Sequence, residues 1–411
     1  MRPPPCHRAT TAHLQAVYPF VSDAANGRGP LIGRDLLGGP FFYDPWELYG
    51  SGRITNPNLL VLGQLGRGKS TFIKTLVWRQ IAFGRRAWIV DPKGEYGPLA
   101  AACGTAPLTL VPGGRNRLNP LDPPNGQVGD PEALTRSRVD LVGSLLASSM
   151  RRPLGAEERT AVEMAVRLAA RDKETPTLPD LVAALLEPDA AAAASVHTDR
   201  AGLAAAGRIP ALELRRMVTG DLAGMFDGPT SASLDPGASV VVLDLSSTFN
   251  SPALPLIMTC ATAWLQSMLS DGAGAKRLVV VDEAWAILND LSTARWSQAT
   301  FKLSRALGVA NVVVVHRISD LRAAGADGST QQKLADGLLA DSETRVVFGQ
   351  PVTEAEATGR DLGLGRTEID TISRLPRGMA LWRVGGRSYV VEHLLGDQER
   401  ALVDTDVAMR S

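Results

Sequence analysis

The stretch from Gly63 to Ser70, GQLGRGKS, fits the pattern G-x-x-x-x-G-K-[ST]. In this pattern the glycines let the backbone curl so that consecutive N–H groups face phosphate oxygens, and the N-terminus of the following helix adds partial positive charge. Lys69 is expected to bridge the β and γ phosphates of a nucleotide, and Ser70 to ligate Mg²⁺. A glycine-rich turn that precedes a helix by chance is the alternative. The predicted nucleotide-binding residues are Gly63, Gln64, Leu65, Gly66, Arg67, Gly68, Lys69, Ser70 and Thr71.

Two acidic residues, Asp282 and Glu283, follow the apolar run Leu278–Val281. A strand there would place the carboxylate of Asp282 at the sheet edge beside the phosphate-binding loop, where it can hold a Mg²⁺-bound water. Glu283 is the predicted general base that deprotonates the attacking water, and it joins Lys69 as a predicted catalytic residue. The alternative for Glu283 is a solvated acidic cap on the next helix.

Three further candidates also follow predicted strands. Asp91 begins the segment Asp91–Tyr96 (DPKGEY) and ends a strand expected to neighbour the strand before the loop, so it is a candidate contact of the nucleotide or its metal. Asp-Pro-Lys-Gly is also a good turn, and a turn alone would explain these residues. His316 and Arg317 follow the run 312–315 at the same edge and are candidate catalytic residues that sense the γ-phosphate.

These residues predict an ATPase whose cofactors are ATP and Mg²⁺. No Asn-Lys-x-Asp motif, which would read guanine, occurs near the end of the predicted sheet, so ATP is favoured over GTP. The formal net charge of zero does not nominate nucleic acid as a partner.

The cysteines and the apolar runs predict the compartment. Cys6, Cys103 and Cys260 lack metal-ligand spacing and cannot all pair with one another, which indicates a reducing, cytoplasmic environment. No uninterrupted apolar run approaches the roughly 20 residues that span a bilayer. Any association with a membrane is therefore expected to come through partners.

Short apolar runs alternate with amphipathic segments from Leu59 onward, which predicts an α/β fold with a mostly parallel central sheet. Near-continuous valine and leucine runs are typical of strands buried on both faces. The last two strands, joined at Gly385-Gly386, are predicted to form an antiparallel hairpin. The predicted strands are 59–62, 87–90, 108–111, 240–244, 278–281, 312–315, 345–348, 379–382 and 389–391, with a helix at about 70–83.

Helical spacing replaces the strands between about 130 and 222, which predicts an all-helical insertion. Its alanine-rich stretch, 189–195, is expected to be a helix end or a flexible connection. The predicted organisation is an N-terminal segment with a small β-layer (1–57), the first part of a nucleotide-binding core (58–129), the insertion (130–222), and the second part of the core with the hairpin (223–411).

The chain resembles the motor domains of type IV secretion and conjugation ATPases, in the HerA/FtsK superfamily of P-loop NTPases. The resemblance covers most of the chain from about Pro30, and the pairing of DPKGEY with Asp-Glu-Ala-Trp is more specific than the loop alone. The residues that carry it are Asn56–Asn58, Gly63–Thr71, Asp91–Tyr96, Leu118–Leu121, Met225–Gly228 and Val281–Trp285.

This resemblance implies a RecA-like fold and Mg²⁺-dependent ATP hydrolysis that powers a conjugation or secretion apparatus. It also implies a hexameric ring, membrane-embedded secretion components as partners, and DNA as a further candidate partner. In such rings an arginine from one subunit completes the site of its neighbour. The candidate arginines are Arg317, Arg345, Arg360 and Arg366.

The chain departs from the family pattern at one functional position. Arg305–Gly308 followed by a strand resembles the Arg-x-x-Gly segment of DNA-translocating relatives, but Val315-His316 stands where they have Thr-Gln. An imidazole could donate one hydrogen bond in place of the amide. The large amino-terminal domain typical of the secretion ATPases is also expected to be missing. Two alternatives stay open: a DNA translocase, and a nucleotide-gated assembly subunit that rarely hydrolyses ATP.

Overall fold

A computed structural model describes residues 28–403 except 37–38, 124–129, 232–234, 236, 270–275, 286–293, 295–306, 319–335 and 338. An 11-stranded sheet with the order β2-β1-β11-β10-β9-β3-β8-β7-β4-β6-β5 forms its centre. The strands are β1 (Leu31–Asp35), β2 (Gly39–Phe42), β3 (Leu59–Leu62), β4 (Arg86–Asp91), β5 (Leu108–Thr109), β6 (Val240–Asp244), β7 (Arg277–Val281), β8 (Val309–Val315), β9 (Thr344–Phe348), β10 (Met379–Val384) and β11 (Arg387–His393).

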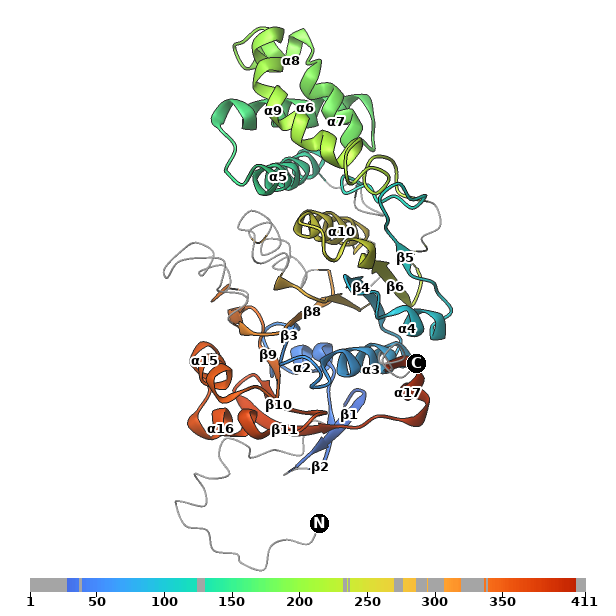
Figure 1. The fold of residues 1–411 in the computed structure, drawn as a ribbon, viewed down its shortest axis with the longest axis vertical. Coiled ribbons are helices and arrows are strands. Elements are labelled where there is room, and N and C mark those ends of the chain that lie inside the picture. The colour runs from blue at the N-terminus through green and yellow to red at the C-terminus, as the bar shows by residue number, and fades with distance from the viewer. Residues whose placement is uncertain are drawn as a thin grey trace, which may run out of the picture.

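The helices fall into a set that accompanies the sheet and a set that lies beyond it (Figure 1). The first set is α2 (Pro45–Gly50), α3 (Lys69–Ala82), α4 (Gly97–Ala102), η1 (Ser246–Thr248), α10 (Leu254–Leu269), α15 (Val352–Leu362), α16 (Arg366–Arg374) and α17 (Asp397–Val403). The second set is α5 (Pro131–Met150), α6 (Ala156–Asp172), α7 (Leu178–Leu186), α8 (Ala190–Ser195) and α9 (Arg200–Val218).

Strands β9, β3, β8, β7, β4, β6 and β5 form a continuous parallel block, as predicted. Alternate residues of β3 pack on opposite faces: Leu60 and Leu62 lie in the same core as α10, whereas Leu59 and Val61 lie in the core of α3. One expectation is wrong. Strand β4 does not neighbour β3, because β8 and β7 lie between them.

The antiparallel edge of the sheet begins at β10, which pairs with β9 and β11. The predicted hairpin is therefore confirmed, and Gly385 in its turn has a φ of 59°. The predicted N-terminal β-layer exists as β1 and β2, but it is not separate, because β1 pairs with β11 and extends the main sheet. A Cβ at Gly33 would lie 2.0 Å from the carbonyl oxygen of Glu392, so only glycine permits this close pairing.

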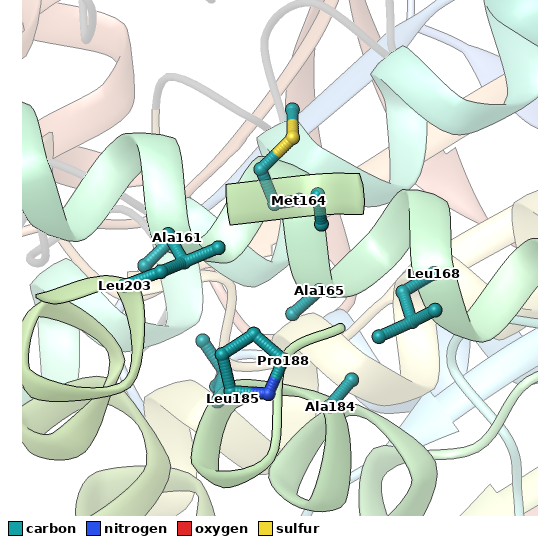
Figure 2. Close-up of a pocket in the computed structure, with 9 residues that line it drawn as sticks. Ala161, Met164, Ala165, Leu168, Ala184, Leu185, Pro188 and Leu203 are labelled. Atoms are coloured by element: carbon teal, nitrogen blue, oxygen red, sulfur yellow. The ribbon is translucent and has the colours of Figure 1, made fainter. Parts of the chain in front are cut away.

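Helices α5 to α9 form a bundle on the α10 side of the sheet (Figure 1). Their core is built from small and aliphatic side chains, and Figure 2 shows Ala161 and Ala165 of α6 facing Leu185 of α7 and Leu203 of α9. The small pocket between these helices is lined only by apolar residues, so it contains no side chain that could act in catalysis.

The boundaries predicted for the domains stay predictions.

The alanine-rich stretch corrects another expectation. Residues 190–195 form the short helix α8 rather than a flexible connection, because the side chain of Asp189 accepts a hydrogen bond from the Ala192 N–H at 2.6 Å. An N-terminal cap of this kind satisfies a backbone donor that the helix leaves unpaired.

Candidate functional site

The predicted phosphate-binding loop connects β3 to α3. Gly63, Gly66 and Gly68 have φ values of 149°, 74° and 109°, a region that L-residues rarely adopt. A Cβ at Gly63 would lie 2.5 Å from the Cβ of Phe348 on β9. The glycine pattern therefore has a conformational cause, and the loop curls directly into the N-terminus of α3.

Lys69, the first residue of α3, is 5% exposed. Its ammonium donates hydrogen bonds to the carbonyl of Gly63 and, at 3.1 Å, to that of Gln64. Burial lowers its pKa to about 8, although Asp282 and Glu283 act in the opposite direction. The ammonium is therefore held inside the loop and poorly hydrated, a setting in which an anionic phosphate would be a strong partner.

Asp282 follows β7 and is 7% exposed. Burial raises its pKa, and the neighbouring carboxylate of Glu283 adds to this effect. Its Oδ1 accepts a hydrogen bond from the Glu283 N–H at 3.0 Å, and its Oδ2 accepts one from the Tyr96 hydroxyl at 3.1 Å. Both carboxylate oxygens are therefore held in place, and each keeps a further lone pair.

Glu283 is 3% exposed and has a left-handed φ of 52°, so it is not the solvated helix cap that the sequence left open. Its carboxylate accepts hydrogen bonds from Lys93 and Trp285, and its Oε1 lies 2.8 Å from Nε2 of His316. Burial alone would raise the pKa of Glu283, but His316 and Lys93 outweigh it and lower the pKa to about 2. The carboxylate is therefore ionised and held in place by Lys93, Trp285 and His316, and we call these three contacts the clamp on Glu283.

The carboxylate of Asp91 is fully buried and accepts hydrogen bonds from the backbone N–H groups of Lys93, Gly94 and Tyr96. Burial raises its pKa to about 6, although the backbone hydrogen bond from Tyr96 acts in the opposite direction. These contacts favour the interpretation that Asp91 closes a turn. Its contact with a nucleotide stays a prediction.

The remaining predicted residues occupy the same edge of the sheet. Ser70 and Thr71 lie half-buried in the first turn of α3. His316 contacts Glu283, whereas the Arg317 side chain is 54% exposed and lies 3.9 Å from Glu354. The structure thus brings His316 to the predicted base and leaves Arg317 at the surface.

The four arginines that are candidates to complete the site of a neighbouring subunit differ in their environments. The guanidinium of Arg345 donates to the carbonyls of Leu339, Ser342 and Leu362, so it serves the chain's own fold. Arg360 and Arg366 are exposed. The segment that begins at Arg305 lies partly outside the described residues.

The sequence interpretation gave no role to Lys93, Tyr96 and Trp285, whose side chains hold the two acidic residues. All three lie inside the two most specific motifs, DPKGEY and Asp-Glu-Ala-Trp. Their place inside these motifs was the one sequence feature that could have pointed to a role for them. Only the fold shows that the two motifs lie in contact. Within the described ranges, no group of three or more His, Cys, Asp or Glu side chains is arranged to hold a metal ion.

The chain is similar to known proteins in part of its sequence and in its fold. A family model described as an AAA-like domain matches residues 47–109, which contain the phosphate-binding loop and Asp91. No curated protein matches the sequence. VirB4 of Thermoanaerobacter pseudethanolicus is a similar solved structure, with a TM-score of 0.76 and 20% identity over 93% of this chain and 99% of that one.

The plasmid coupling protein TrwB is also similar. Its complex with ADP and Mg²⁺ gives a TM-score of 0.61 and 18% identity over 94% of this chain and 96% of that one. Its complex with the ATP analogue ADPNP gives 0.60 and 19% over 92% and 93%. The chain therefore has the RecA-like P-loop NTPase fold of VirB4 and TrwB.

Proposed function

We propose that this protein is a Mg²⁺-dependent ATP hydrolase that acts as the cytoplasmic motor of a conjugation or type IV secretion-like apparatus. The observation that carries the proposal is the fold shared with VirB4 over 93% of the chain, together with a complete phosphate-binding loop beside Asp282 and Glu283. The TrwB complexes with ADP, Mg²⁺ and ADPNP support the same nucleotide and metal.

The residues of the site divide the work of hydrolysis. The loop N–H groups and Lys69 would bind the phosphates, and Ser70 and Asp282 would hold Mg²⁺, which neutralises charge on the phosphates when it is bound. The donor set fits this ion, because Mg²⁺ prefers a few carboxylate and hydroxyl oxygens supplemented by waters.

Glu283 would take a proton from the attacking water. A carboxylate with a pKa near 2 is a weak base, so its bonds to Lys93 and His316 oppose catalysis. Release of these bonds would raise the pKa of Glu283 toward its ordinary value and expose the carboxylate to water. Catalysis therefore requires a rearrangement around Glu283, and contact of His316 with the γ-phosphate would provide one.

The proposal is tested by steady-state ATP turnover of the purified protein. Lys69→Ala should abolish turnover, and Glu283→Gln should lower it by about 10²–10⁴-fold while ATP still binds, because only the proton acceptor is lost. Lys173→Ala is the matched control, because Lys173 forms an exposed ion pair with Asp180 in the insertion. Turnover that survives Lys69→Ala would refute the assignment.

The partners follow from the same proposal. None of the described helices is long and apolar enough to cross a membrane. We propose a homo-hexameric ring that docks on membrane-embedded secretion components, with Arg317, Arg360 or Arg366 serving the neighbouring site. Turnover per subunit that rises steeply with protein concentration would support this assembly. So would a fall in turnover when the arginine that completes the neighbouring site is replaced by alanine.

A second candidate function, DNA translocation, is favoured by the likeness to the conjugative coupling protein TrwB. It predicts stimulation of turnover by double-stranded DNA, and DNA binding that weakens steeply with salt because phosphate contacts release counterions. Turnover that depends on Glu283 but is indifferent to DNA would leave the secretion motor as the better proposal.

The clamped state of Glu283 favours a third candidate, an assembly subunit that binds ATP and rarely hydrolyses it. This function predicts ATP-dependent oligomerisation with little release of phosphate. Brisk phosphate release by the wild-type protein would exclude it.

A further inference from the structure

A buried tyrosine connects the two specific motifs at the sheet edge. Tyr96, the last residue of DPKGEY, is fully buried, and its hydroxyl donates a hydrogen bond to Oδ2 of Asp282 at 3.1 Å. Its backbone N–H donates to Oδ2 of Asp91 at 2.9 Å. Strands β4 and β7 are paired neighbours with Val90 opposite Val281, so the chain of contacts runs between adjacent strand ends.

The ring of Tyr96 contacts α3, the helix that follows the phosphate-binding loop. The ammonium of Lys74 on α3 lies 5.5 Å from the ring centroid, and Lys74 itself is fully buried. Within the described part of the chain this ammonium makes no hydrogen bond, and the aromatic face of Tyr96 gives it a favourable contact. Tyr96 is thus fixed by its backbone, its ring and its hydroxyl.

We propose that Tyr96 is a positioning residue for Asp282, orienting its carboxylate toward the Mg²⁺ of bound ATP. Mg²⁺ requires near-octahedral geometry, so a ligand or water-holding carboxylate that rotates loses much of its value. The hydroxyl of Tyr96 and the N–H of Glu283 each hold one oxygen of this carboxylate and restrict its rotation. Outer contacts of this kind typically change metal affinity by about 10–100-fold. This inference rests on the proposed function.

A purely structural role for Tyr96 makes a different prediction. A ring that only fills the core would contribute to stability, and loss of its hydroxyl would leave the metal dependence of turnover unchanged. Tyr96→Phe separates the two roles, because phenylalanine keeps the ring between Lys74 and the core and removes only the hydroxyl.

The experiment measures ATP turnover as a function of Mg²⁺ concentration for the wild-type protein and for Tyr96→Phe. We expect the half-saturating Mg²⁺ concentration to rise about 10–100-fold in the variant. The affinity for a fluorescent ATP analogue in the presence of EDTA should stay within about twofold, because the loop contacts are untouched. Tyr43→Phe is the matched control: Tyr43 is 1% exposed, but it packs against Trp382 on β10, four strands away from β7.

The outcomes are distinguishable. A Tyr96→Phe protein with the wild-type thermal midpoint and an unchanged half-saturating Mg²⁺ concentration would overturn the inference. An equal rise in Tyr43→Phe would also overturn it, because the effect would then reflect core packing. A wild-type protein that shows no Mg²⁺-dependent turnover would instead refute the proposed function.

Discussion

Arg79 on α3 holds together three parts of the chain that are distant in sequence. Its guanidinium forms a two-pronged ion pair with Glu399 of α17, with N···O distances of 2.6 and 2.7 Å. It also donates to the carbonyls of Leu31, Ile32 and Leu394 at 2.6–3.0 Å. One side chain thus attaches α17 and the β1 edge to the helix that begins at the phosphate-binding loop.

The burial of this ion pair determines how much stability Arg79→Ala should cost. The side chains of Arg79 and Glu399 are 17% and 8% exposed. Removal of one partner of a buried pair costs about 3–5 kcal/mol, because the other charge is left buried without compensation. The second pair at this sheet edge, Arg34 with Glu392, has exposures of 63% and 40%, and an exposed pair contributes only about 0–1 kcal/mol.

Hydrogen–deuterium exchange of residues 394–403 measures this local cost, because it reports the opening free energy of a segment rather than of the whole molecule. With a tenfold change for each 1.4 kcal/mol, Arg79→Ala should accelerate exchange of the protected α17 amides by roughly 10²- to 4 × 10³-fold. Arg34→Ala, the control, should change exchange of β1 and β11 by less than about fivefold. An acceleration of less than tenfold in Arg79→Ala would refute the reasoning from burial.

Three further predictions concern the site and its surroundings. Gly63→Ala should abolish ATP binding in a calorimetric titration, because the new methyl group would displace the loop from Phe348 on β9. His316→Gln should keep turnover within about tenfold of wild type and His316→Ala should not, because glutamine, unlike alanine, can still donate a hydrogen bond to the γ-phosphate in place of the imidazole. Burial lowers the pKa of His393 to about 3. Between this value and the ordinary pKa of about 6.5, the unfolded chain binds a proton at His393 that the folded chain does not. The free energy of unfolding should therefore decrease as the pH falls below about 6.5. The loss is about 1.4 kcal/mol per pH unit, and urea unfolding of His393→Gln between pH 4 and 7 should lack this component.

The local chemistry was predictable from the sequence because it depends on short patterns. Val240–Asp244 forms a strand with the predicted bounds, since a valine run buried on both faces has few alternatives. The phosphate-binding loop was predictable for the same reason, because its glycines and Lys69 are adjacent in the chain. Asp282 and Glu283 follow β7 as predicted.

The order of the strands was not predictable in this way. Sequence order alone places β4 beside β3, whereas β8 and β7 arrive later in the chain and insert between them. The clamp on Glu283 depends on this order, since Lys93 follows β4 and His316 follows β8. Arg345 was a candidate for a neighbouring site because no local pattern shows that three carbonyls of its own chain receive its guanidinium.

The strand order also explains why one histidine could couple the nucleotide to the base. Leu62 at the end of β3 lies opposite Val315 of β8, so the loop and His316 leave the sheet side by side. Strand β7 lies on the other side of β8, and the Ala284 N–H donates to the carbonyl of Val314 at 3.1 Å, so Glu283 leaves beside His316 as well. His316 therefore stands between the phosphate-binding loop and the base. A γ-phosphate that attracts the imidazole would draw it from Glu283, and binding of ATP would then loosen the clamp that keeps the base weak.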